Sequence, residues 1–198
     1  EISTRDWSSD VCSSDLLEVL RDLGAEVLFF SPLADEPTPP CDAVWLPGGY
    51  PELHAATLSQ AVRTRDSIRT HVELGRPVWA ECGGMMPLFE SIVLADGAAH
   101  AMWGLLPGRV TMQKRLAAIG PQQWRLHAGA LTGHTFHYSR CDTTLIPAFH
   151  AEAIRGDAVQ PGEAIYRRGA LLGTYFHAWF ASCPDATASI FGGDIRSG

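Results

Sequence analysis

The sequence lacks the features of a disulfide framework, a zinc site or a membrane span. Its five cysteines form no Cys-x-x-Cys pair, and their odd number and irregular spacing argue against structural disulfides and bound zinc. No uninterrupted apolar run is long enough to cross a bilayer. The formal net charge of -7 provides no basic footprint, so we expect neither nucleic acid nor an anionic membrane as a partner. The cysteines are Cys12, Cys41, Cys82, Cys141 and Cys183.

The first sixteen residues differ in character from the rest of the chain. They contain a near repeat, Ser-Ser-Asp-Val followed by Ser-Ser-Asp-Leu, and no sustained amphipathic period. We interpret residues 1–16 as an adapter-like segment, non-native or disordered, and leave Cys12 out of functional reasoning. This acidic, serine-rich start has no basic and apolar signal-peptide regions, so we expect a cytoplasmic protein. Residues 17–198 are expected to form one domain around one core.

From Leu17 onward, short apolar runs alternate with helical segments, which is typical of an α/β protein. Such strands form a mostly parallel sheet with flanking helices, and ligands bind beyond the carboxyl ends of the strands. After residue 92, we expect added antiparallel strands. The predicted helices cover 17–23, 51–74, 85–92 and 184–191; the predicted strands cover 26–30, 42–46, 77–81, 109–113, 131–138, 163–166 and 170–176.

Cys82 stands where a predicted strand meets a predicted helix. Gly83 and Gly84 follow it at once, which favours a nucleophile elbow, since glycines allow backbone angles and close approaches that a Cβ forbids. The positive end of the following helix would lower the pKa of the thiol and favour the thiolate. The alternative is a buried cysteine that packs as a small hydrophobic residue.

A cysteine nucleophile needs a base, and His177 is the candidate. It closes the apolar strand over 170–176 and would therefore lie at the same sheet edge as Cys82. A strand-end histidine can equally serve only as a hydrogen-bonding residue. The other seven histidines lie in predicted loops, in predicted helices or in the middle of predicted strands: His54, His71, His100, His127, His134, His137 and His150.

Two glycines follow the strand that precedes the elbow. Gly48 and Gly49 leave their backbone N–H groups unobstructed, and the amide of Gly83 is the other customary donor to an oxyanion. The alternative for Gly48 and Gly49 is a plain tight turn. With Cys82 and His177, these donors would suit acyl transfer from an amide or ester through a thioester.

Four motifs in this order closely resemble one family. They are Leu-Pro-Gly-Gly-Tyr-Pro-Glu-Leu-His at 46–54, Ala-Glu-Cys-Gly-Gly-Met-Met at 80–86, Gly-His-Thr-Phe-His-Tyr-Ser at 133–139 and Gly-Thr-Tyr-Phe-His at 173–177. Together they resemble the class I glutamine amidotransferase domain of the cobyrinate or hydrogenobyrinate a,c-diamide synthases, over about residues 17–191. The resemblance implies a flavodoxin-like fold and a glutamine-hydrolysing carbon–nitrogen ligase, in which Cys82 attacks glutamine and His177 acts as acid and base.

The resemblance also implies partners and cofactors outside this chain. Ammonia would pass to an ATP- and Mg²⁺-dependent domain that amidates the a and c carboxylates of a corrinoid in cobalamin biosynthesis. No cofactor or metal is expected in the chain itself, which has no Gly-x-x-x-x-Gly-Lys-Ser/Thr loop for ATP. The first strand of the amidotransferase domain would precede Leu17 and is expected to be missing. The resemblance leaves a homodimer open.

One departure from many class I glutaminases keeps alternatives open. They carry a glutamate two residues after the histidine, whereas this sequence reads His177-Ala178-Trp179, so the third member of the site is undefined. The family resembled here also commonly lacks that glutamate. The alternatives are an amidotransferase domain of the cobyric acid synthase type, a non-catalytic binding module with the same fold, and a cysteine hydrolase for another amide.

Overall fold

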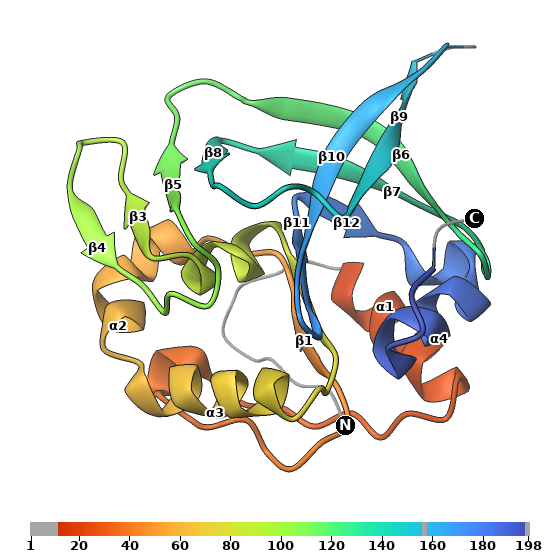
Figure 1. Ribbon diagram of the computed structural model, residues 1–198, viewed down its shortest axis with the longest axis horizontal. Coiled ribbons are helices and arrows are strands. Elements are labelled where there is room, and N and C mark those ends of the chain that lie inside the picture. Colours follow the sequence, from red (N-terminus) through yellow and green to blue (C-terminus); the bar gives the residue numbers. More distant parts are fainter. Residues whose placement is uncertain (1–11, 156–157, 197–198) are drawn as a thin grey trace.

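The computed structural model describes residues 12–155 and 158–196, and its main element is an eight-stranded mixed sheet (Figure 1). The order of the strands is β1-β2-β11-β10-β9-β6-β7-β12. In chain order they are β1 (Val44–Leu46), β2 (Val78–Glu81), β6 (Ala118–Leu126), β7 (Gly129–His137), β9 (Phe149–Arg155), β10 (Ala158–Arg168), β11 (Leu171–Thr174) and β12 (Phe176–Ala178).

The parallel part of this sheet consists of β1, β2 and β11. Ala80 of β2 pairs with Leu46 of β1 on one side and with Gly173 of β11 on the other. Beyond β11 the pairs are antiparallel, from β10 to β12. Because parallel strands end at the same edge, the loops after β1 and β2 lie together, as the sequence predicts.

A smaller sheet has the order β4-β3-β5-β8. Its strands are β3 (Ser91–Val93), β4 (Ala99–Ala101), β5 (Arg109–Met112) and β8 (Ser139–Asp142). Strand β8 follows β7 after a single residue, Tyr138, so the two sheets are directly connected beside the end of β7.

Helices cover both faces of the parallel strands. Helices α2 (Ala55–Ser59) and α3 (Val62–Glu73) lie on one face, and α1 (Cys12–Asp22) and α4 (Pro184–Gly192) lie on the other (Figure 1). Short 3-10 turns complete the fold: η1 (Pro32–Ala34), η2 (Pro51–His54), η3 (Cys82–Gly84), η4 (Met86–Leu88) and η5 (Phe180–Ser182). The α/β class with flanking helices and added antiparallel strands is confirmed.

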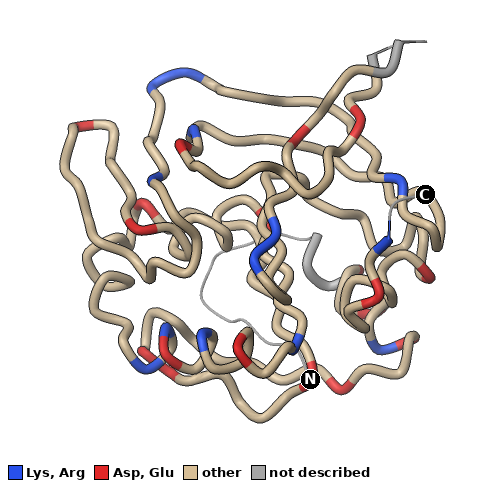
Figure 2. Tube along the Cα trace, in the orientation of Figure 1, with Lys and Arg blue, Asp and Glu red and all other residues tan. Residues whose placement is uncertain are grey.

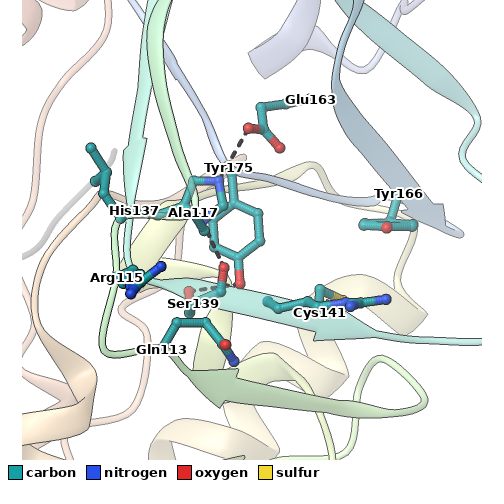
Figure 3. A pocket seen from close by; sticks show the side chains of 11 residues that line it. Gln113, Arg115, Ala117, His137, Ser139, Cys141, Glu163, Tyr166 and Tyr175 are labelled. Carbon is teal, nitrogen blue, oxygen red and sulfur yellow. Dashed lines mark hydrogen bonds and ion pairs between the residues drawn. The ribbon is translucent and has the colours of Figure 1, made fainter. Parts of the chain in front are cut away.

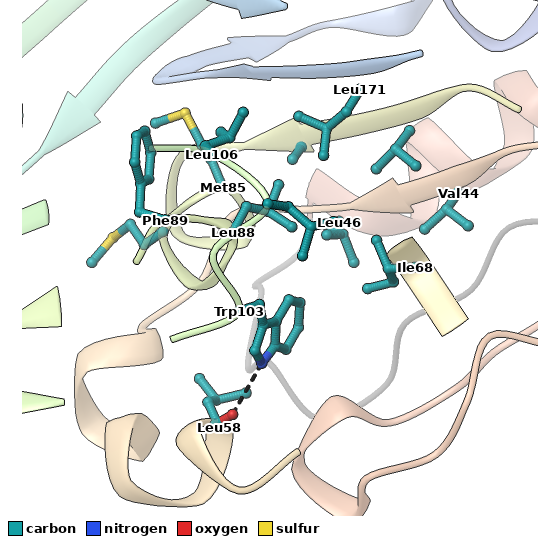
Figure 4. Close-up of a cluster of buried hydrophobic side chains, with 14 of the residues drawn as sticks. Val44, Leu46, Leu58, Ile68, Met85, Leu88, Phe89, Trp103, Leu106 and Leu171 are labelled. Carbon is teal, nitrogen blue, oxygen red and sulfur yellow. Dashed lines mark hydrogen bonds between the residues drawn. The ribbon is translucent and has the colours of Figure 1, made fainter. Parts of the chain in front are cut away.

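One hydrophobic cluster lies on each face of the parallel strands. Successive side chains of a strand contribute alternately to the two clusters. On β1, Val44 and Leu46 join the cluster with Leu58 and Ile68 of the α2–α3 side (Figure 4), whereas Trp45 joins the other. Successive side chains of a strand point to opposite faces, so continuous apolar runs are needed where both faces are covered.

Basic and acidic residues are interspersed along the trace (Figure 2).

Several sequence predictions of local structure differ from the structure. The strand predicted over 170–176 is two strands, β11 and β12, and His177 lies within β12 and does not close β11. The helix predicted over 17–23 is part of α1, which begins at Cys12; residues 1–11 of the adapter-like segment lie outside the described residues. The helical region predicted over 51–74 is η2, α2 and α3 in succession. The helix predicted over 85–92 is wrong, because η4 ends where Phe89 becomes extended, with ψ of 176°, and Ser91 enters β3.

The strand predicted over 26–30 is also wrong. The segment has no strand assignment, although Phe30 and Val27 contribute to the two hydrophobic clusters. In a flavodoxin-like sheet the second strand pairs with the first, and the first lies between the second and the third. In the described part of the chain no strand lies beyond β1 at that edge of the sheet, so the segment has no ladder to join.

Candidate functional site

Cys82 lies at a sharp turn directly after β2. Its φ is 44°, in the left-handed region that non-glycine residues rarely adopt and that costs on the order of 1–3 kcal/mol unless the surroundings hold it. The side chain is 8% exposed, and its Sγ donates a hydrogen bond to the carbonyl oxygen of Phe136, 3.8 Å away. The strand and sharp turn of a nucleophile elbow are therefore present, with 3-10 turns in place of the helix.

The glycines after Cys82 are required by close backbone contacts. A Cβ on Gly83 would overlap the carbonyl oxygen of Gly49, and a Cβ on Gly84 would overlap that of Leu46. The elbow thus packs, backbone against backbone, on the loop that follows β1. This contact places the Gly48–Gly49 loop beside the Cys82 turn.

The Gly48–Gly49 loop also touches His177. A Cβ on Gly48 would lie 2.5 Å from Cε1 of the His177 ring, so a side chain here would displace the imidazole. Within the described residues, no acceptor is assigned to the backbone N–H of Gly48 or Gly49. These two amides are therefore available as donors beside the cysteine, which suits stabilisation of an oxyanion.

His177 belongs to β12 and pairs across the sheet with His134 of β7. The two imidazole rings are stacked, with centroids 4.9 Å apart and planes 9° from parallel. Cys82 meets the same part of β7 at Phe136, two residues from His134. The structure therefore brings Cys82, His177 and the Gly48–Gly49 loop to one place, although no direct hydrogen bond joins Cys82 to His177 among the described contacts.

The ionisation of Cys82 is opposite to the sequence prediction. Burial raises the pKa of the thiol to about 12; the Gly83 backbone N–H opposes the shift, and the charges of Glu81, Glu52 and Glu163 add to it. The prediction of a lowered pKa is wrong, because burial of the thiol outweighs the groups that favour the thiolate, and only 3-10 turns follow Cys82 in place of the expected helix. Cys82 is therefore a neutral thiol near neutral pH.

The imidazole of His177 is correspondingly uncharged near neutral pH. Its pKa is lowered to about 4, chiefly by burial and also by His134 and His137, whereas Glu163 acts to raise it. A neutral thiol beside a neutral imidazole is one of the two ways to arrange such a pair, the other being a thiolate–imidazolium ion pair. Here the proton would leave sulfur during attack and not before it.

A polar network that the sequence did not indicate lies behind the end of β7. Glu163 of β10 accepts a hydrogen bond from Oγ1 of Thr135 at 2.8 Å, and its Oε1 lies 3.1 Å from Nε2 of His137. His137 stacks on Tyr175, whose hydroxyl accepts a hydrogen bond from Ser139 at 2.8 Å. No spacing in the sequence links Glu163 to His137, since β10 and β7 are distant in the chain.

A cavity of about 450 Å³ opens over this network. Figure 3 shows His137, Glu163, Ser139 and Tyr175 gathered in it. The charge of Glu163 raises the pKa of both Cys82 and His177. The cavity is therefore close enough to the candidate site to influence its ionisation. A zwitterionic ligand would find both acidic and basic groups along its lining, because Arg140 lies there too.

The described residues form neither a metal-binding cluster nor a membrane-spanning helix. No group of three or more histidine, cysteine, aspartate or glutamate residues is placed to hold a metal ion there. None of the described helices combines the length and apolar character needed to cross a membrane.

Comparisons with known proteins identify the family of the chain. The CobB/CobQ-like glutamine amidotransferase domain model matches residues 14–184. A cobyrinate a,c-diamide synthase of Herminiimonas arsenicoxydans is 50% identical over 182 residues, which cover 91% of this chain and 41% of that protein. A hydrogenobyrinate a,c-diamide synthase of Pseudomonas aeruginosa is 43% identical over 174 residues, or 88% of this chain and 40% of that protein. The chain thus spans about two fifths of the length of these curated relatives.

Solved structures support the fold alone. A crystal structure of a glutamine amidotransferase superposes with a TM-score of 0.59 at 19% identity and covers 98% of each chain. The structure of PurLQS from Thermotoga maritima gives a TM-score of 0.59 at 14% identity, covering 98% of this chain and 92% of that one. With the extent of the domain match, the conclusion is plain: the chain belongs to the CobB/CobQ-like glutamine amidotransferase domain family.

Proposed function

We propose that this domain is the glutaminase half of an ATP-dependent corrinoid a,c-diamide synthase, with Cys82 as nucleophile and His177 as acid and base. The observation that carries the proposal is the meeting of three parts at one edge: the strained Cys82 turn, the free amides of the Gly48–Gly49 loop and the His177 ring against Gly48. The family description supports glutamine as the substrate, and the names of the relatives support a corrinoid as the acceptor in the longer protein.

The reaction would begin with a neutral thiol and a neutral imidazole. As Sγ of Cys82 bonds to the amide carbon of glutamine, His177 takes the thiol proton, and the carbonyl oxygen becomes an oxyanion facing the amides of Gly49 and Gly83. His177 then gives the proton to the amide nitrogen as the carbon–nitrogen bond breaks, and ammonia leaves. The high pKa of the thiol disfavours a free thiolate between turnovers.

Water completes the cycle. His177 takes a proton from a water molecule as its oxygen attacks the thioester, the carbon–sulfur bond breaks, and the proton returns to Sγ with release of glutamate. Ammonia would be used elsewhere in the longer protein, by a part that binds ATP, Mg²⁺ and the corrinoid, cobyrinate or a relative of it. Mg²⁺ and ATP therefore belong to our proposal for the whole synthase and not to the site described here. The cytoplasmic location and a homodimer stay predictions.

The test is glutamate release from glutamine, combined with labelling by a glutamine-analogue electrophile. Replacing Cys82→Ala should abolish labelling and lower turnover by on the order of 10⁴-fold, because the nucleophile of a covalent hydrolase has no substitute. Cys183→Ala is the matched control, since Cys183 is half-buried far along the chain and only donates to the Ala128 carbonyl.

Other outcomes would contradict the proposal. A folded protein with neither glutamate release nor a label at Cys82 would instead be the non-catalytic binding module. Faster turnover of other amides than of glutamine would indicate a different cysteine hydrolase. The observation that favours a non-catalytic binding module is the buried, uncharged state of the Cys82 thiol.

A further inference from the structure

The strand that carries His177 lies at the far end of the main sheet from the elbow. β12 is last in the strand order and β2 is second, so no backbone ladder joins the two. Yet the backbone N–H of Ala178, the residue after His177, donates to Oε1 of Glu81, the residue before Cys82, at 3.4 Å. The sheet therefore curls so that β12, its last strand, comes close to the end of β2. The Glu81 side chain connects the two strands there.

The direction of the backbone groups explains why a side chain is needed there. In an antiparallel pair, the N–H groups of successive residues point to opposite sides of the strand. Directly after β12, the backbone N–H of Trp179 donates to the carbonyl of Thr132 of β7 at 2.9 Å, so the N–H of Ala178 points away from β7. An N–H buried at that point costs free energy unless an acceptor reaches it, and Glu81 is the acceptor.

The neighbouring donor on β12 is satisfied in the same way. The N–H of Phe176 donates to Oγ1 of Thr174, at the end of β11, at 3.0 Å. Thr174 and Glu81 are paired in the β11–β2 register, so both acceptors come from one level of the parallel strands. The strand that holds the base is thus attached to β2 and β11 by two side chains and to β7 by its ladder.

Glu81 is itself held firmly. Its side chain is buried, with 2% of the residue exposed, and Oε1 accepts a second hydrogen bond from Nε1 of Trp79 at 2.5 Å. Burial raises the pKa of this carboxyl to about 8, so it is mostly uncharged near neutral pH. An uncharged buried carboxyl serves as a fixed acceptor without the cost of a buried charge.

We propose that Glu81 is a positioning residue, which sets the place of the His177 imidazole relative to Cys82 by accepting the Ala178 N–H. It needs its carbonyl-type oxygen for this and not a negative charge. The inference rests on the proposed function insofar as it takes His177 as the base of that reaction. It also offers a substitute for the glutamate that many class I glutaminases carry two residues after the histidine.

The experiment compares Glu81→Gln with Glu81→Leu, and Glu152→Gln is the matched control because Glu152 only joins Gln123 and Arg125 on the surface. Amide hydrogen exchange reports the hydrogen bond directly. In Glu81→Leu, exchange at Ala178 should rise by about tenfold or more, as expected when a protecting bond is lost, while exchange at Trp179 stays unchanged. In Glu81→Gln and Glu152→Gln, both amides should exchange as in the unaltered protein.

Kinetics and histidine titration complete the test. Glu81→Leu should lower kcat for glutamine by about tenfold with KM within about twofold, since positioning of the base acts on the chemical step. The same variant should shift the NMR-monitored titration of His177, and Glu81→Gln should restore both kcat and titration. If Glu81→Leu does not fold, the Gln variant decides through its Ala178 exchange and His177 titration.

Three results would overturn the inference: unchanged exchange at Ala178 in Glu81→Leu, equal losses of kcat in the Gln and Leu variants, or a loss confined to KM. The exchange and titration measurements need no glutamine turnover. Absence of turnover in the unaltered protein would therefore count against the proposed function, whereas the fate of the Ala178 hydrogen bond would be decided separately.

Discussion

The parallel and antiparallel parts of the main sheet supply different halves of the candidate site. The nucleophile side is local: β1, β2 and the two glycine loops that follow them hold Cys82 and its amide donors by backbone contacts. The base side is assembled over long distances, because His177 depends on β7, on Gly48 and on Glu81 for its place. An elbow held by backbone contacts is thus combined with a histidine held by ring stacking and by hydrogen bonds to its strand.

The largest expected effect comes from breaking the nucleophile side. Gly83→Ala should lower the free energy of unfolding by about 3 kcal/mol and abolish labelling of Cys82, because the new Cβ meets the Gly49 carbonyl and neither backbone can move aside. Urea unfolding and electrophile labelling measure the two effects. Gly192→Ala is the control, since a Cβ there meets no atom within 4 Å. Equal stability of the two variants would contradict the close packing of the elbow.

A smaller effect is expected where the two sides meet. Gly48→Ala should displace the His177 ring and lower kcat by about 100-fold, as misplacement of a catalytic group by about 1 Å does. The ring can shift, so the loss of stability should be smaller than for Gly83→Ala. Glutamate release and thermal unfolding check the two numbers. A variant with normal kcat would mean that His177 is not the base.

The stacking contact on the base side should affect pH dependence more than rate at neutral pH. His134→Ala exposes His177 and removes a group that lowers its pKa, so the pKa of His177 should rise from about 4. Because the base must be unprotonated, turnover below about pH 6 should fall several-fold while turnover at pH 8 stays close to normal. His134→Phe, which keeps a ring on His177, should fall between. Identical pH profiles would remove His134 from the site.

The last effect concerns stability and pH. The pKa of Glu81 is raised to about 8 in the folded protein, above its ordinary value of 4.5, so the folded state holds a proton that the unfolded state releases between these pH values. Stability should therefore decline as pH rises from about 5 to 8, and Glu81→Gln should flatten this decline. Unfolding midpoints at pH 5 and pH 8 provide the measurement. A steeper decline in the Gln variant would reverse the assignment.

The nucleophile side was predictable because it is written in contiguous residues. A strand, Cys82, two glycines and a preceding Gly-Gly loop specify a sharp turn at the edge of a parallel sheet, and the structure has these parts in contact. The absence of a helix after Cys82 was not predictable. Phe89 becomes extended and Ser91 pairs with β5, and this pairing depends on residues distant in the chain. The error over the ionisation of Cys82 follows mainly from burial of the thiol, which the sequence pattern does not reveal.

The base side was predictable only in the identity of His177. His134, Glu81 and Glu163 reach the site through strand pairing and the curl of the sheet, and no spacing along the chain marks them. Glu81 stood inside the motif around Cys82, but its role depends on Ala178, which lies 97 residues further on.

By itself, the sequence determined the α/β class, the elbow at Cys82, the neighbouring glycines, the histidine and the family, because these depend on short-range patterns of apolar residues, glycines and motif order. The tertiary structure alone shows that the Cys82 thiol and the His177 imidazole are both uncharged near neutral pH and that the buried carboxyl of Glu81 accepts the backbone N–H of Ala178. The physical reason is that burial and hydrogen-bond partners are set by residues distant in the chain, and these determine pKa values and positions within a site.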